Sequence, residues 1–257
     1  MRHVILPDHA VRDIVFYLAM EEYLARNMTY DAFFLWQAPE AVIIGRNQDL
    51  ESEVNLSWCM QHGISVFRRH SGGGCVYSDM GNIMVSCITS GGDVAFVFEL
   101  YLQRLALALR NLGLPVSVSG RNDILLGGRK ISGNAFYRLP SRNIVHGTLL
   151  YNVSMDNLQN AITPSVLKLA SKGIRSVRQR VVNLKDFIED GGVQYRSLSG
   201  AGMPLHDTES LKEYLAGFFC DEAPECLGME DVAEIEKIRS GYLDPEFIAS
   251  GRRSRTV

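Results

Sequence analysis

The chain has 257 residues, of which 46% are hydrophobic, so it can bury a substantial core in one large domain or in a domain with an appendage. Its formal net charge is −3, which excludes a globally basic surface that would attract nucleic acid or an anionic membrane. Any anionic substrate must therefore be attracted by local charges.

The N-terminal segment and the cysteines bear on the compartment. The segment before Arg12 is interrupted by Pro7 and Asp8, so it lacks the apolar core of a signal peptide, and no apolar run approaches a membrane span. The five cysteines form no C-x-x-C pair, which favours free thiols in a reducing compartment and argues against a zinc site. We therefore expect a cytoplasmic protein that binds neither nucleic acid nor a membrane.

Two helices are predicted in the first half of the chain. Asp13 to Asn27 has apolar residues on one side, with Glu21 and Glu22 placed elsewhere. Asp93 is the expected N-cap of the longest helix, which should end near Gly113. An apolar series in this second helix is typical of a core-facing stripe, and it consists of Phe96, Leu100 and Leu107.

Short β-rich runs lie between and after these helices. The runs are Phe33 to Trp36, Ala41 to Ile44, Ile83 to Ile88, Val116 to Ser119, Ile131 to Tyr137 and Val145 to Val153. Adjacent runs joined by turns predict a mixed, mostly antiparallel sheet flanked by helices, which is an α+β fold. Two further helices are expected later in the chain, at Asp207 to Phe219 and at Glu230 to Tyr242.

The most informative motif is the glycine-rich segment Arg68-Arg69-His70-Ser71-Gly72-Gly73-Gly74, which lies between two apolar runs. It is not a P-loop, because no Lys-Ser or Lys-Thr follows it, and the pattern G-x-G-x-x-G fails at Tyr77. A strand, a loop and a strand are predicted, with a plain hairpin turn as the alternative. Arg68 and Arg69 should point to opposite sides of the first strand, so the register decides which of them faces a ligand.

Two later blocks have the same character. One is Gly120-Arg121-Asn122-Asp123, and the other is Gly128-Arg129-Lys130-Ile131-Ser132-Gly133, running on to His146-Gly147-Thr148-Leu149-Leu150. The glycines let backbone N–H groups approach a ligand, and the neighbouring basic groups could neutralise phosphate or carboxylate charge. Together the three blocks predict an anion site that suits a nucleotide and an acid substrate.

A basic run follows in the second half of the chain. Thr163 to Lys185 carries six basic residues and no acidic residue. Such a run is often a solvated face. Beside a nucleotide site, with Gly173 as a hinge, it also becomes a candidate loop for closing over phosphates.

These blocks, together with Asp79-x-Gly81-Asn82, resemble the lipoate-protein ligase A family. Ser171 to Leu184 looks like the adenylate-binding loop of that family, and the strands around Trp36 look like its early pocket strands. The resemblance covers about residues 10 to 220. It implies a biotin/lipoate ligase-like catalytic domain at residues 1–225 and a short helical C-terminal tail at residues 226–257, without the full accessory domain of longer relatives.

The resemblance implies two-step chemistry. The carboxylate of lipoate attacks the α-phosphate of ATP to give lipoyl-AMP and pyrophosphate, and a lysine of an acceptor domain then attacks the acyl group. Mg²⁺ is an implied cofactor. The implied acceptors are the E2 subunits of 2-oxo-acid dehydrogenases and the glycine cleavage H protein, and a separate accessory-domain protein is a further implied partner.

By the same resemblance, Lys130 lies between the carboxylate and the α-phosphate, and Asp123 orients it or holds magnesium. The alternatives are a surface lysine for Lys130, a turn-forming residue for Asp123, and core positions for Trp36 and His146. The implied ATP or adenylate contacts are Arg69, Gly74, Cys75, Val76, Tyr77, Asn122, Lys130, Lys172 and Arg178. The implied lipoate contacts are Trp36, Arg69, Ser71, Gly72, Gly73, Lys130 and His146.

Several functions remain open. Ser78 stands where many relatives have a histidine, and without an accessory domain the chain could use preformed lipoyl-AMP or depend on a partner for adenylation. An octanoyl or lipoyl transferase would need a thiolate at Cys75 or Cys87. A biotin ligase is disfavoured because its Gly-Arg-Gly-Arg type of loop is absent. A non-catalytic lipoate-binding module is the remaining alternative.

Overall fold

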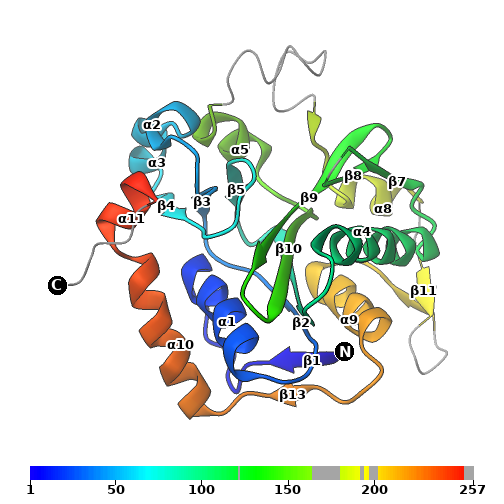
Figure 1. Ribbon diagram of the computed structural model, residues 1–257. Helices are drawn as coiled ribbons and strands as arrows, with labels where there is room; N and C mark the ends of the chain where they lie inside the picture. The colour runs from blue at the N-terminus through cyan, green and yellow to red at the C-terminus, as the bar shows by residue number, and fades with distance from the viewer. Residues whose placement is uncertain (121, 164–179, 192–193, 197–201, 252–257) are drawn as a thin grey trace.

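A computed structural model describes residues 1–120, 122–163, 180–191, 194–196 and 202–251. Its centre is an eight-stranded sheet in the order β13-β1-β2-β6-β10-β9-β8-β7 (Figure 1). β1 runs parallel to both of its neighbours and the other pairs are antiparallel, so the predicted mixed, mostly antiparallel sheet is confirmed. The strands are β1 Arg2–Ile5, β2 Ala32–Trp36, β6 Asn82–Ser90, β7 Val116–Ser119, β8 Asp123–Leu126, β9 Arg129–Arg138, β10 Arg142–Leu150 and β13 Glu225–Cys226.

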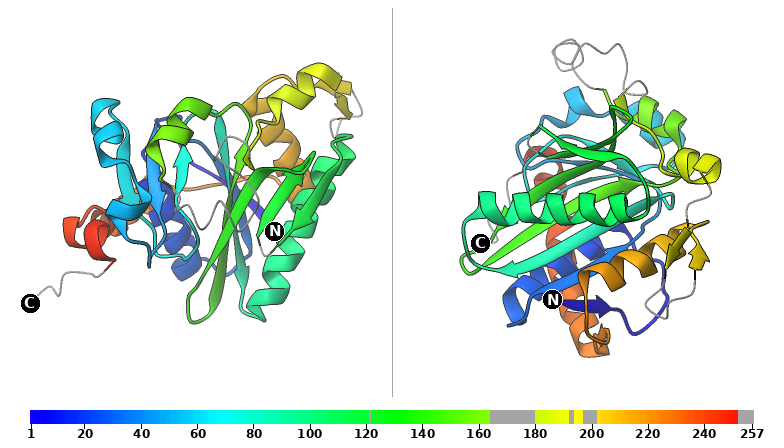
Figure 2. Two further views of the ribbon diagram at one scale, coloured as in Figure 1. Left: turned by 90° about the horizontal axis from the view of Figure 1, so that it is seen from above. Right: turned by 90° about the vertical axis from the view of Figure 1, so that its right-hand side faces the viewer.

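Helices cover both faces of this sheet (Figure 2). α4 (Val94–Asn111), α8 (Lys185–Gly191) and α9 (Thr208–Phe219) lie on one face, and α1 (Ile14–Asn27) lies on the other with α10 (Met229–Tyr242) packed against it. Alternation along β2 sends Phe33 into the core under α4 and Phe34 into the core under α1. None of the described helices is both long and apolar enough to cross a membrane.

A second, three-stranded sheet in the order β4-β3-β5 stands beside the large one. β3 pairs in parallel with β4 and antiparallel with β5, so the two strands around the glycine-rich segment lie on opposite sides of β3. The hairpin alternative is therefore wrong, because the strands of a hairpin pair with each other. The remaining elements are β3 Ala41–Ile44, β4 Ser65–Arg68, β5 Val76–Ser78, β11 Gln194–Arg196, β12 Gly202–Pro204, α2 Leu50–Glu53, α3 Leu56–Gln61, α5 Met155–Ala161 and α11 Pro245–Ser250.

The predicted helix starts are confirmed by their caps. Asp13 accepts a hydrogen bond from the backbone N–H of Phe16, and Asp93 accepts one from that of Phe96. The expectation for the polar side of α1 is wrong, because Glu21 and Glu22 are buried. α1 packs against the sheet and against α10, so both of its long faces are covered.

The apolar series in α4 also lies on the unexpected face. Phe96, Leu100 and Leu107 are 65%, 56% and 49% exposed, so the prediction that they belong to the core is wrong. The face that packs on the sheet carries Tyr101, Leu102, Leu105, Ala106, Ala108 and Leu109. α4 is apolar on both sides, and spacing within a helix cannot tell which side meets the sheet.

The C-terminal helices pack against the rest of the chain. α10 lies against α1, and α11 lies against β4 (Figure 1). The predicted boundary between residues 225 and 226 falls inside β13, which pairs with β1. We propose that the tail, as far as Gly251, is part of the same packed unit as the catalytic domain.

Candidate functional site

The three glycine and basic blocks meet at one cavity of about 260 Å³, called here the Lys130 cavity. It lies between the glycine-rich segment that follows β4, the start of β8 and the strands β9 and β10. Nine residues expected at the site from the sequence line it, namely Arg69, Gly73, Gly74, Cys75, Val76, Asn122, Asp123, Lys130 and His146.

Lys130 is held by Asp123. Its Nζ lies 2.7 Å from Oδ1 of Asp123, and a guanidinium nitrogen of Arg180 lies 3.0 Å from Oδ2 of the same carboxylate. Burial by itself would raise the pKa of Asp123, but Lys130 and Arg180 outweigh it and the pKa is lowered. Asp123 therefore orients two cations at the cavity. One of them, Arg180, belongs to the basic run.

Local backbone structure makes room for this lysine. Lys130 pairs with Leu125, whereas Ser132 pairs with Ile124, so a bulge follows Lys130 in β9. A Cβ atom on Gly133 would lie 2.3 Å from Nζ of Lys130. A side chain at position 133 would therefore displace Nζ of Lys130 from its present position.

The Asp123→Asn variant should lose stability at neutral pH by about 1–3 kcal/mol, because two cations then face an uncharged, buried amide. The wild-type pKa is lowered, so the extra stability is present above pH 3.8 and disappears as the pH falls through the lower folded value. Urea unfolding at neutral and acidic pH measures this difference. As a control, Glu234→Gln removes the exposed pair with Lys237 and should leave the unfolding midpoint unchanged. A loss that is the same at both pH values would contradict the ion-pair explanation.

Arg69 binds the glycine-rich segment itself. Its guanidinium donates to the carbonyls of Ile43, Gly72 and Gly74 at 3.1, 2.8 and 2.8 Å, and its Nε donates to Oγ of Ser71 at 2.9 Å. Burial lowers its pKa to about 10, so it stays protonated at neutral pH. Arg69 thus holds the glycine-rich segment together through hydrogen bonds to its own positively charged side chain. Direct contact between Arg69 and a ligand anion stays a prediction. Arg68 points away from the cavity, which answers the register question.

A buried polar chain leads from the same loop to α1. Oγ of Ser71 lies 2.7 Å from Nε2 of His146, and Nδ1 of His146 lies 2.7 Å from Oε2 of Glu21. This spacing resembles a nucleophile, base and acid triad. The Ser71 hydroxyl, however, is 2% exposed and also accepts from Arg69. We therefore propose that this series of polar contacts orients the imidazole of His146. Of its three residues, His146 is the one that lines the cavity.

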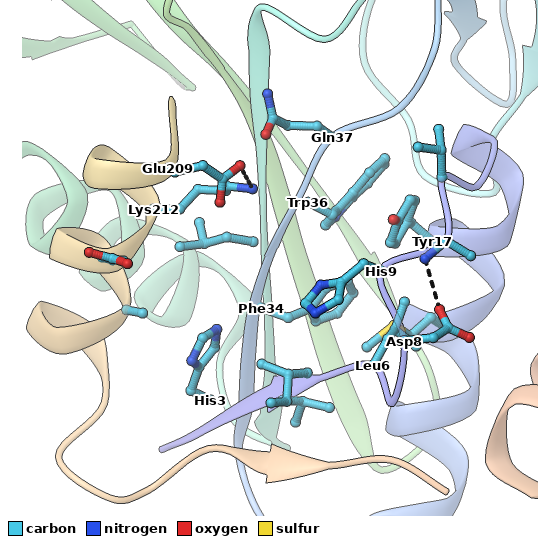
Figure 3. Close-up of a pocket in the computed structure, with 18 of the residues that line it drawn as sticks. His3, Leu6, Asp8, His9, Tyr17, Phe34, Trp36, Gln37, Glu209 and Lys212 are labelled. Carbon is cyan, nitrogen blue, oxygen red and sulfur yellow. Dashed lines mark hydrogen bonds and ion pairs between the residues drawn. The ribbon is translucent and has the colours of Figure 1, made fainter. Parts of the chain in front are cut away.

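Trp36 does not contact the Lys130 cavity as expected. Its indole N–H donates to Oγ of Ser86, which donates to Glu21, so Trp36 lies behind the polar chain. Within the described part of the chain it lines a different cavity of about 540 Å³, where its ring stacks on Tyr17 (Figure 3). Figure 3 also shows His3 and His9 at this second cavity, which begins where β1 diverges from β2.

Other expected residues lie outside the Lys130 cavity. Tyr77 is buried, and its hydroxyl donates to the carboxylates of Glu40 and Asp79, neither of which lines the cavity. Among the described residues, Ser71, Gly72 and Ser78 do not line the cavity, and the buried Ser78 donates to Sδ of Met84, which does line it. Two expected adenylate contacts, Lys172 and Arg178, lie outside the described residues.

Sequence reasoning missed several lining residues. Asn134 follows the Lys130 block directly and exchanges hydrogen bonds with Asn122, so extending the motif by one residue would have found it. Glu21, which reaches the cavity by way of His146, was expected away from the apolar side of its helix, yet it is buried. The apolar lining residues carry no signal that separates them from the core, and they are Leu18, Ile43, Met84 and Ala135.

The donor set at the cavity does not form a metal cage. Asp123 supplies the sole carboxylate among the described residues that line it, and each of its oxygens faces a cation. The described chain also contains no group of three or more candidate metal ligands. Magnesium at a nucleotide site is commonly held by one or two carboxylates together with substrate phosphates, so its binding by Asp123, which is already paired with two cations, stays a prediction.

This chain is similar to known proteins over a range that includes the residues lining the Lys130 cavity. The family model for the lipoyl protein ligase A/B catalytic domain matches residues 13–196. Lipoate–protein ligase 1 of Staphylococcus aureus is 40% identical over 188 residues, which is 72% of this chain and 57% of that protein. Lipoate-protein ligase A of Psychrobacter cryohalolentis is 37% identical over 209 residues, which is 80% of this chain and 58% of that protein. The chain thus spans a little over half the length of these relatives.

Solved structures share the fold over the whole chain. The bipartite lipoate protein ligase of Thermoplasma acidophilum, described with its E2 lipoyl domain, superposes with a TM-score of 0.79 at 24% identity and covers 100% of both chains. A lipoate-protein ligase A bound with ATP superposes with a TM-score of 0.77 at 22% identity and covers 98% of this chain and 100% of its own.

Proposed function

Because the chain belongs to the lipoyl protein ligase A/B catalytic-domain family, we propose that it activates lipoate with ATP and transfers the lipoyl group to an acceptor lysine. The observation that carries the proposal is the position of Lys130. It lies near the start of β9, is held by Asp123, and lines the same cavity as the glycine-rich segment and several basic groups.

In the first step, a carboxylate oxygen of lipoate attacks the α-phosphorus of ATP, the bond to the β-phosphate oxygen breaks, and pyrophosphate leaves. In the second step, the neutral amine of the acceptor lysine attacks the acyl carbon, AMP leaves, and an amide forms. Lys130 is suited to both steps because it places a fixed positive charge where negative charge develops. Arg180 adds a second positive charge beside it.

The nucleotide is proposed to contact the backbone from Gly73 to Val76 and the amide of Asn122. Magnesium is proposed to enter with the nucleotide, held mainly by phosphate oxygens, because Asp123 is already paired with two cations. The apolar residues Leu18, Ile43 and Met84 would take the acyl chain.

The proposed acceptors are the lipoyl domains of 2-oxo-acid dehydrogenase E2 subunits and the glycine cleavage H protein. A solved structure with the same fold is described with its E2 lipoyl domain, which supports an acceptor of this class. That ligase is bipartite, which supports a separate accessory-domain protein as a second partner. A cytoplasmic location is also proposed, because the described cysteines are free thiols, which suit a reducing compartment.

A lipoylation assay tests the proposal. The protein is mixed with an apo acceptor domain and supplied either with ATP and lipoate or with preformed lipoyl-AMP, and the acceptor mass is measured. Modification in both reactions supports a complete ligase, and modification with lipoyl-AMP alone identifies a transferase or a partner-dependent ligase. The absence of both product and pyrophosphate would leave a non-catalytic binding module.

A cysteine-dependent transferase is the second candidate function. The two candidate thiols, Cys75 and Cys87, lie in different environments. Burial raises the pKa of Cys87 to about 12, so this thiol stays protonated at neutral pH and is a poor nucleophile. Cys75 lines the Lys130 cavity and is the remaining candidate. We expect mass spectrometry of the enzyme mixed with octanoylated carrier protein to find no acyl group on Cys75. A trapped octanoyl-Cys75 thioester would favour the transferase over adenylation.

A further inference from the structure

Arg68 is a buried arginine that joins two distant segments. Its side chain donates to the carbonyls of Ile248 and Ala249 at 2.8 and 2.9 Å, in the last turn of α11. It also donates to three carbonyls of the turn after β3, those of Gly45, Arg46 and Gln48, at 3.0, 3.1 and 2.7 Å. The residue is 1% exposed, so its charge is compensated by these five carbonyl dipoles, two of them at a helix C-terminus.

Side chains alternate in direction along an extended chain, so Arg68 and His70 point to the same side and both contact the C-terminal helices. His70, two residues later, lies against Tyr242 and Phe247, each with ring centroids 4.5 Å from its own. The C-terminal strap, defined here as residues 229–251, therefore contacts positions 68 and 70. Arg69, between them, faces the Lys130 cavity.

The turn after β3 continues the connection to the glycine-rich segment. The backbone N–H of Arg46 donates to the carbonyl of Ser71 at 3.0 Å. A Cβ atom on Gly45 would lie 2.3 Å from the carbonyl oxygen of Gly73, so the two loops are in backbone contact. At the other end, a Cβ atom on Gly251 would lie 2.5 Å from the carbonyl oxygen of Arg46. The strap, the turn and the glycine-rich segment are thus packed in series.

We propose that Arg68 is a positioning residue through which the C-terminal strap orders residues 71–75 and so sets the affinity of the Lys130 cavity for its acid substrate. The strap lies beyond the residues that the family model matches. Within the described residues, its last helix reaches the pocket loop through Arg68, through the ring of His70 and through the turn at residues 45–48. The claim about loop order does not depend on the substrate, whereas the claim about affinity rests on the proposed function.

The guanidinium group is required by this geometry. It spreads its donors over a plane, so it can reach α11 and the turn together, whereas the ammonium of lysine is a single point with fewer donors. Arg68→Lys keeps the charge but should leave one set of carbonyls without a donor. Gly251→Val disturbs the same contact from the other side, because Gly251 has φ 72° and no room for a side chain.

The order of the loop is measured by alkylation. Cys75 lies in the glycine-rich loop, and Cys226 is exposed on β13, so iodoacetamide labelling of Cys75 relative to Cys226 reports local opening within one molecule. In both variants we expect this ratio to rise about ten- to a hundredfold, the change that follows from losing one or two charge-assisted hydrogen bonds. The concentration of lipoate that protects Cys75 should rise by a similar factor.

A matched arginine controls for a general loss of stability. Arg104 is a partly buried residue of α4 that donates to the carbonyls of Phe218 and Phe219 and lies over the Phe219 ring. Arg104→Lys should lower the unfolding midpoint without changing the Cys75 to Cys226 ratio. The proposal is overturned if Arg68→Lys and Gly251→Val behave like Arg104→Lys. If lipoate protects Cys75 in no protein, including the wild type, the proposed function fails while the labelling ratio still decides the role of Arg68.

Discussion

Replacing Lys130 with alanine is expected to abolish the formation of lipoyl-AMP, with a loss in rate of about a thousandfold or more. The reason is the arrangement of charge. Lys130 is oriented by a buried carboxylate and projects into the cavity where two anions must meet. Without it, the repulsion between the lipoate carboxylate and the α-phosphate is no longer offset at the point of attack.

Pyrophosphate release from ATP and lipoate measures this step without an acceptor protein. Lys212→Ala is the matched control, because Lys212 also pairs with a carboxylate, that of Glu209 at 2.6 Å, but lies on α9 at the second cavity (Figure 3). It should release pyrophosphate at the wild-type rate. Normal pyrophosphate release by Lys130→Ala would remove Lys130 from the mechanism.

The second large effect is expected from Gly73→Val, which should weaken the binding of both ATP and lipoate by about ten- to a hundredfold. Gly73 has φ 95°, in the region that β-branched residues avoid at a cost of about 1–3 kcal/mol. A Cβ atom there would also lie 2.9 Å from a guanidinium nitrogen of Arg69. The substitution thus strains the loop and displaces the arginine that holds it.

Gly72→Ala is the control within the same loop. A Cβ atom at Gly72 meets nothing within 4 Å, and its φ is outside the left-handed region. Isothermal titration of each ligand into both variants separates a conformational requirement at Gly73 from a general sensitivity of the loop. Equal losses in the two variants would refute the argument from φ.

Much of the fold could be predicted because its signals are local. The helix starts at Asp13 and Asp93, and the β-rich runs of the strands, depend on residues a few positions apart. The short strand β1 and the small helices α2 and α11 carry too few residues to show a period, so they were not predicted. Their existence depends on the neighbours they pack against.

The candidate site was predicted less evenly. The glycine and lysine blocks did converge, because each is a motif whose spacing reflects backbone constraints such as the room that Gly133 leaves for Lys130. Trp36 was placed in the wrong cavity, because a residue type says nothing about which side of a strand faces a pocket. Alternation along the strand predicted that Arg68 and Arg69 point to opposite sides. Only the structure shows that Arg69 is the one that faces the cavity.

The sequence by itself determined the α+β composition and the main helix limits, and it predicted that Lys130, Asp123 and the glycine-rich segment meet at one place. Tertiary structure decided the rest. It pairs His146 with Glu21 across 125 positions, and it brings Arg180 to Asp123 across 57. It also joins Arg68 to α11 across 180. Propensities and motifs act between residues near one another in the chain, whereas burial and ion pairing depend on which distant segments the packed core brings together.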